Sequence, residues 1–188
     1  MPLSLASARR HLHTRTVRCE GFVREDGLWD IEGYLCDVKS YDITNRDRGE
    51  IKAGEPIHDM AIRLTIDVDL MIHAAEAVID AAPFAMCPRI SERFALLKGL
   101  RIGTGWRKQL RQLFGQTAGC THLLELLNPM ATTAYQTLYR AREEQAQAQG
   151  TGREKPRVID SCHTFASDSE VVQFFWPQFY TGKTDHVE

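Results

Sequence analysis

The chain has 188 residues, of which 43% are hydrophobic and 26% charged, and its formal net charge at pH 7 is −2. This composition is typical of one globular domain with a real core, and it excludes an intrinsically disordered chain. The small net charge argues against a nucleic-acid partner, because phosphate binding needs a basic face. The sequence has no run of 18 apolar residues, so we also expect no membrane partner.

The cysteines and the amino-terminal residues indicate the compartment. Five cysteines without close spacing predict free thiols in a reducing environment rather than a disulfide framework. Residues 1–13 lack the apolar segment of a secretory signal and are interpreted as a flexible leader. The sequence therefore predicts a cytoplasmic protein.

The first half of the chain predicts an antiparallel sheet. Asp26 and Gly27 separate two runs with strand character, and Asp-Gly in that position is a strong hairpin signal. Residues 45–56 are polar, contain two glycines, and are interpreted as a loop. Four strands are expected in chain order: residues 17–24, 28–43, 57–67 and 68–80.

Two-residue alternation assigns side chains to the faces of these strands. Gly33 shares a face with Trp29, which predicts a bulge or a close backbone approach at the glycine. His58 falls on the apolar face of the third strand, whereas Asp59 and Arg63 fall on the other face. His58 is then either a functional residue or a hydrogen-bonded core histidine, and Asp59 either a ligand or the partner of Arg63.

The second half predicts helices that cover the sheet, which gives an α+β fold class. Two short helices end near Leu100 and Phe114, and Thr104 is a candidate N-cap for the second. A long helix is expected from residue 119 to about residue 145, and Pro129 should kink or restart it. Beyond the domain of residues 14–145, a linker (146–155) leads to an apolar C-terminal segment (156–188) that is expected to dock on the domain.

Cys120 falls in the first turn of the long helix. The positive end of the helix dipole favours a thiolate there, which is the form that attacks electrophiles and binds metals. The alternative is a small buried hydrophobe that begins a core helix. A second pair, Cys162 and His163, has no assigned role, because neighbours in an extended segment point to opposite sides.

Six motifs in this order resemble the bacterial family catalogued as domain of unknown function 2889. They cover nearly the whole chain: residues 26–33, 54–60, 63–67, 119–123, 131–136 and 160–163. The resemblance implies kinship without an established activity.

The order of Asp59, Cys87 and Cys120 is also similar to that of iron-sulfur scaffold proteins of the NifU and IscU type. This resemblance implies that Asp59 matches their aspartate, Cys87 their second cysteine and Cys120 their third. Ile57 stands in place of the first cysteine, and Gly119 in place of the histidine before the third. Because a thiolate is missing, we expect a zinc or iron site with mixed ligands rather than a mobile cluster.

The candidate metal ligands are Asp59, Cys87, Cys120 and His122, a set large enough for tetrahedral zinc. Residues 120 and 122 are two apart, and a regular helix would point them in nearly opposite directions. Both can therefore bind one ion only if the first turn is irregular. A site of Asp59, Cys87, Cys120 and a water is an equal alternative.

Three kinds of function remain open. The first is a small-molecule enzyme of metal-assisted hydrolysis or lyase type, with the metal or Cys120 as reactive centre and His122 or His58 as base. The second is a metal or iron-sulfur carrier, and the third is a homodimeric interaction module with structural cysteines. In the enzyme, three further residues are expected to line the pocket: Trp29, Arg63 and Trp106.

Overall fold

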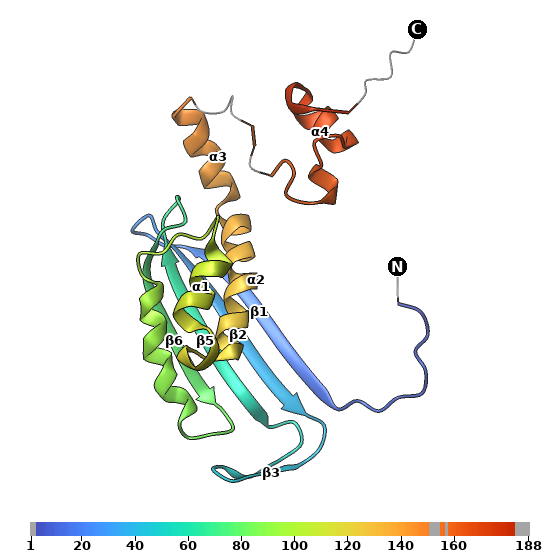
Figure 1. Ribbon diagram of the computed structural model, residues 1–188, viewed down its shortest axis with the longest axis vertical. Helices are drawn as coiled ribbons and strands as arrows, with labels where there is room; N and C mark the ends of the chain where they lie inside the picture. Colours follow the sequence, from blue (N-terminus) through green and yellow to red (C-terminus); the bar gives the residue numbers. More distant parts are fainter. Residues whose placement is uncertain (1–2, 151–154, 157, 183–188) are drawn as a thin grey trace. The chain divides into compact units, whose positions relative to one another are not determined.

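The computed structural model describes residues 3–150, 155–156 and 158–182. The chain divides into two compact units, Met1–Arg142 and Glu143–Glu188. The first unit is an α+β domain in which helices α1 and α2 cover one face of an antiparallel sheet (Figure 1). The predicted fold class is therefore confirmed.

The main sheet has four antiparallel strands in the order β1-β2-β5-β6. Their bounds are β1 (His13–Val23), β2 (Trp29–Lys39), β5 (Pro56–Ile66) and β6 (Ile72–Ala81). The turn between β1 and β2 contains Asp26 and Gly27, and Gly27 has a φ of 82°, a conformation that suits glycine. The predicted hairpin and the four strands in chain order are thus present.

A small second hairpin of residues 43–51 overlaps the segment of residues 45–56 that was expected to be a loop. Strand β3 (Ile43–Asn45) pairs with β4 (Gly49–Ile51). The Asn45 side chain closes the turn by accepting hydrogen bonds from the backbone N–H groups of Asp47 (2.9 Å) and Arg48 (3.0 Å). Three-residue strands are too short to show alternation, so the sequence pattern did not reveal them.

Helix α2 (Thr121–Thr137) approaches the backbone of β2 closely at Gly33. A Cβ atom at Gly33 would lie 2.6 Å from the sulfur of Met130 and 3.0 Å from Cγ of Leu126. The predicted close approach at this glycine is therefore observed. Helix α2 packs across β1, β2 and β5, and the contact at Gly33 is made by Leu126 and Met130 in the middle of the helix.

The face of the sheet under α2, here called the helix face, carries the core. Phe94 stacks on Phe114 with ring centroids 4.6 Å apart, which closes the core beside β6. Fully buried residues come from both layers: Ile31, Leu35, Met60, Ile62 and Leu64 from the sheet, and Leu123, Leu126, Leu127, Met130 and Ala134 from α2.

The opposite face, here called the polar face, carries charged side chains. Glu32 accepts a hydrogen bond from Arg63 at 2.7 Å, and the guanidinium of Arg18 lies 4.4 Å from the centre of the Tyr34 ring. The two faces predicted from the alternation of residues along the strands therefore correspond to the core side and the solvent side of the sheet.

A β-bulge interrupts the pairing of β2 with β5. Asp37 pairs with His58 and Val38 pairs with Pro56, so Ile57 is an extra residue in β5. Bulges of this kind re-aim side chains and are common next to functional sites. This one lies beside Asp37 and His58, two of the residues that form the cluster described below.

The remaining helices of the first unit are the 3₁₀ segment η1 (Cys87–Leu97), which packs along β6, and α1 (Trp106–Phe114), followed by η2 (Gln116–Ala118). Thr104 is not the cap of α1, contrary to the sequence prediction. The N-cap is Gly105, whose φ of 84° is left-handed, and it makes no side-chain cap hydrogen bond.

Helix α2 continues through Pro129, so a restart of the helix there is wrong, while a kink stays a prediction. Its buried face, which includes Leu126, Leu127 and Met130, packs on the sheet and outweighs the missing hydrogen bond. The helix ends instead at Leu138, and α3 (Tyr139–Ala148) follows.

The second unit includes the end of α3 and, among its described residues, three further short elements: η3 (His163–Phe165), α4 (Glu170–Phe175) and η4 (Pro177–Phe179). Ser169 caps α4 by accepting a hydrogen bond from the N–H of Val172, whose side chain is buried. The docking of residues 156–188 on the domain stays a prediction. Part of the predicted linker, residues 151–154, lies outside the described residues, and α3 extends into its beginning.

At the other end of the chain, residues 3–12 form neither helix nor strand, and β1 begins at His13, so the flexible leader of residues 1–13 stays a prediction. Across the described residues, no helix combines the length and the apolar character needed to cross a membrane.

Candidate functional site

Asp37 is a buried carboxylate on the helix face of β2, with a residue exposure of 1%. Arg15, opposite it on β1, donates from Nε to Oδ1 and from a terminal nitrogen to Oδ2, each at 2.8 Å. His13 Nε2 lies 3.1 Å from Oδ1. The two hydrogen bonds from Arg15 fix the plane of the Asp37 carboxylate, and the guanidinium charge compensates the charge of this buried group.

Two histidines converge on the same carboxylate from different elements. His58 of β5 places Nδ1 3.0 Å from Oδ2 of Asp37, and His122 in the first turn of α2 places Nε2 3.9 Å from it. The two imidazole rings have centroids 3.9 Å apart and are tilted by 34°. One ligand atom from each of Asp37, His58 and His122 lies within 4.8 Å of the others, close enough to hold a metal ion.

The surroundings shift the pKa values of all three groups downward. Burial alone would raise the pKa of Asp37, but the hydrogen bonds and charge of Arg15 outweigh it and lower the pKa below 3.8. Burial lowers the pKa of His58, and the positive charge of His122 adds to this effect. Burial and the charge of Arg15 lower the pKa of His122. Near neutral pH both imidazoles are therefore unprotonated, the form that binds metals and accepts protons.

Cys120 lies next to this cluster, with Sγ 3.9 Å from Nδ1 of His122. It is the N-cap residue of α2 and has an extended backbone, with φ −101° and ψ 127°. Because Cys120 precedes the first helical residue, the two-residue spacing that would separate side chains on a regular helix does not apply. The two side chains therefore lie close together without an irregular helical turn.

A pocket of about 520 Å³ lies against the two histidines. Its volume is within the usual range for a small-molecule site, roughly 300–1,000 Å³. Much of its wall is apolar, and the thiols of Cys87 and Cys120 and the imidazoles of His58 and His122 also line it. The lining residues are His58, Met60, Ala82, Pro83, Phe84, Met86, Cys87, Arg89, Ile90, Thr117, Gly119, Cys120, Thr121 and His122.

Four residues named from the sequence therefore line one pocket: His58, Cys87, Cys120 and His122. Asp59 is not among them. It lies on the polar face of β5, opposite Cys36 in the strand register, because alternation turns it away from His58.

The three residues expected to line the pocket lie elsewhere. Trp29 is at the far end of β2, where it pairs with Val23 and Ile66. Arg63 is on the polar face, bound to Glu32 rather than to Asp59. Trp106 is a core residue with 6% exposure, and its buried Nε1 has no hydrogen-bond partner among the described residues.

The sequence interpretation missed Asp37 and Arg15. The signal was present in the alternation of β2, because Trp29, Ile31, Gly33 and Leu35 share a face and the next position on it is Asp37. A charged residue on an otherwise apolar face needs a partner or a function.

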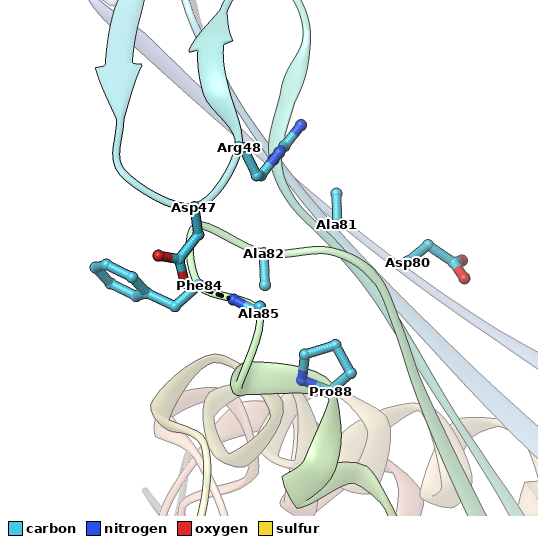
Figure 2. Close-up of a pocket in the computed structure, with 8 residues that line it drawn as sticks. All are labelled: Asp47, Arg48, Asp80, Ala81, Ala82, Phe84, Ala85 and Pro88. Atoms are coloured by element: carbon cyan, nitrogen blue, oxygen red, sulfur yellow. Dashed lines mark hydrogen bonds between the residues drawn. The ribbon is translucent and has the colours of Figure 1, made fainter.

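A second pocket, of about 290 Å³, lies where the β3–β4 turn meets the segment after β6 (Figure 2). Asp47 accepts a hydrogen bond from the N–H of Ala85 at 3.0 Å, drawn as a dashed line, and Arg48 is paired with Glu55. None of the lining residues is a histidine or a cysteine. These contacts hold two loops together, so we regard this pocket as structural.

The profile of one family, described as proteins of unknown function (DUF2889), matches residues 13–136. The matched region contains the sheet and almost all of α2, and therefore the whole Asp37 cluster. No match was found among curated proteins or among solved structures. The resemblance to NifU and IscU scaffolds consequently stays a prediction.

Proposed function

We propose a function from the geometry of the Asp37 cluster, because the chain belongs to the DUF2889 family, whose members have no known function. The proposal is a small-molecule enzyme of hydrolase or lyase type with one zinc or iron ion held by Asp37, His58 and His122. The observation that carries it is the convergence of these three donors beside a pocket of about 520 Å³.

The donor set fits such an ion. Two histidines and one carboxylate are the ligands of several catalytic zinc sites and of non-haem iron sites that keep open positions. Ligand atoms around one such ion lie roughly 3 to 3.5 Å apart. The Asp37–His58 separation of 3.0 Å falls in this range, and the Asp37–His122 separation of 3.9 Å needs a movement of less than about 1 Å.

The residues around the donors have separate tasks in this proposal. Arg15 orients Asp37, and Glu125 in turn accepts a hydrogen bond from Arg15 at 2.9 Å. Outer partners of this kind fix ligand orientation. A bound ion would polarise a substrate oxygen or acidify a water. Cys120, next to His122, would face the reacting molecule, because both residues line the pocket.

Metal content tests this proposal. The protein is purified anaerobically without an affinity tag, incubated with one equivalent of zinc or ferrous ion, desalted, and measured by plasma mass spectrometry. We expect about one ion per chain in the wild type and at least a tenfold loss of affinity in His58→Gln and His122→Gln. The matched control is His73→Gln, because His73 is also paired with an aspartate, Asp67 at 2.8 Å, but lies outside the cluster.

Equal metal binding by all three variants would mean adventitious surface binding and would overturn the proposal. An empty wild type would overturn it as well.

One observation favours a second candidate, a metal-free proton-transfer site. Arg15 already contacts both oxygens of Asp37, so the carboxylate can serve as the group that orients His58. If His58 Nδ1–H donates to Asp37, its Nε2 is left as a proton acceptor, as in a histidine–aspartate pair. Activity that persists in EDTA would select this candidate. A small-molecule ligand is part of both proposals. The homodimer and the absence of nucleic-acid and membrane partners stay predictions.

A further inference from the structure

The charge of the pocket wall indicates which ligands it accepts. None of the described residues that line it is acidic, whereas Arg89 of η1 contributes a guanidinium. That guanidinium has no hydrogen bond or ion pair with any described residue. The nearest buried carboxylate, Asp37, is already neutralised by Arg15.

The start of α2 adds to this positive character. Thr121 and His122, the first two residues of the helix, line the pocket, and the N-cap Cys120 makes no side-chain cap hydrogen bond. The first turn contains no acidic residue. The positive end of the helix dipole is therefore not offset by a side chain of its own.

Most of the rest of the wall is apolar. Its members include Ala82, Pro83 and Phe84 from the segment after β6, together with Met60, Met86 and Ile90. A wall of this kind favours a hydrocarbon body, since burial of apolar surface contributes about 25 cal/mol per Å².

We infer that the pocket binds a small carboxylic acid with an apolar body, whose carboxylate pairs with Arg89 and whose hydrocarbon part contacts the Met60 and Met86 wall. A planar guanidinium matches a carboxylate through two parallel hydrogen bonds, which an uncharged amide cannot reproduce. This inference rests on the proposed function in taking the pocket beside the histidines as the substrate site, and it adds the substrate class.

Hexanoate and hexanamide are suitable probes, because they share a hydrocarbon body and differ in charge. The protein is labelled with [methyl-¹³C]methionine and titrated with each probe in EDTA. Met60 and Met86 report on the pocket, while Met130, a fully buried residue of α2 that does not line the pocket, serves as an internal reference. The two pocket signals are assigned with Met60→Leu and Met86→Leu.

We expect saturable shifts of the Met60 and Met86 signals, with hexanoate binding about tenfold or more tightly than hexanamide. Arg89→Gln should remove this preference and leave hexanamide binding unchanged. Arg107→Gln should behave as the wild type, because Arg107 is an exposed arginine of α1 outside the pocket. Arg89 is itself exposed, so its substitution should not affect folding, which circular dichroism checks.

Equal affinity for the two probes, or no shift of the pocket methionines with either, would overturn the inference. A second titration with one equivalent of zinc separates it from the proposed function. A hexanoate preference that depends on zinc and survives in Arg89→Gln would assign the carboxylate to the metal and overturn the role of Arg89. A preference that depends on Arg89 in a protein that binds no metal would support the inference while the metal proposal fails.

Discussion

Glu32 and Asp37 lie on the same strand, and each is paired with an arginine of a neighbouring strand, but they lie on opposite faces of the sheet. On the polar face, the side chains of Glu32 and Arg63 are 16% and 50% exposed. On the helix face, the side chains of Asp37 and Arg15 are 2% and 35% exposed. The two pairs have similar geometry, with contacts of 2.7 and 2.8 Å.

The difference between the two pairs lies in their surroundings. Water competes for the Glu32–Arg63 pair, and ion pairs of this kind contribute little to stability. Asp37 is cut off from water and depends on Arg15, His13 and His58 to compensate its charge. A carboxylate–guanidinium pair is therefore a surface contact on the polar face, whereas a pair of the same chemistry on the helix face is the centre of a candidate site.

The largest effect is expected from Asp37→Asn. It removes the charge that Arg15 and the histidines surround, and we expect the free energy of unfolding to fall by about 3 kcal/mol. Urea unfolding at pH 7 in EDTA measures it, with Glu32→Gln as the matched carboxylate-to-amide control. A loss at Asp37 no larger than that at Glu32 would contradict the comparison.

An intermediate effect is expected from pH. Burial lowers the pKa values of His58 and His122 from 6.5, so between this value and their folded values the unfolded chain binds more protons than the folded one. Stability must then rise with pH in that window and decline as the pH falls below about 6.5, by at most about 1.4 kcal/mol per histidine and pH unit.

Urea unfolding of the metal-free protein from pH 7 to pH 5 measures this dependence. The double variant His58→Gln/His122→Gln should lose clearly less stability over the same range. The Glu32 carboxylate on the polar face does not contribute to this pH range, because hydrogen bonds from Tyr34 and Arg63 lower its pKa below 4.5. Identical pH profiles for the wild type and the double variant would show that the histidines are not the titrating groups.

The smallest effect is expected from Arg63→Gln. This side chain is half exposed, and we expect a loss of about 1 kcal/mol or less in the free energy of unfolding. Added salt should shrink the loss further, because it screens exposed charges. A double-mutant cycle with Glu32→Gln isolates the pair, and a coupling well above about 1 kcal/mol would remove the distinction between the two faces.

Much of the sheet was predictable because its determinants are local. The Asp26–Gly27 turn sets the register of the first hairpin, and this register places Arg15 opposite Asp37. The close approach at Gly33 followed from the absence of a side chain among large apolar neighbours. The continuity of α2 through Pro129 was not predictable, since it depends on packing against strands far away in the sequence.

The candidate site was only partly predictable, for a related reason. His58 and His122 were identified from their positions, but the carboxylate was assigned to Asp59 and Asp37 was missed, because the order of motifs was followed rather than the face. The alternation that puts His58 inward puts Asp59 outward, and this conflict was visible in the sequence. The pairing of Asp37 with His58 was not visible in the sequence, because the β3–β4 hairpin and a bulge separate β2 from β5.

The extra residue Ile57 shifts the phase of the two-residue repeat in β5. From His58 onward, every second side chain of β5 points to the core. Pro56, before the bulge, pairs with Val38. A one-residue change in a regular ladder would turn every following side chain to the other face. Because the bulge lies between the β3–β4 hairpin and His58, changes of length in the hairpin can be absorbed there. Related chains should then be free to vary this hairpin while the orientation of the histidine is inherited unchanged.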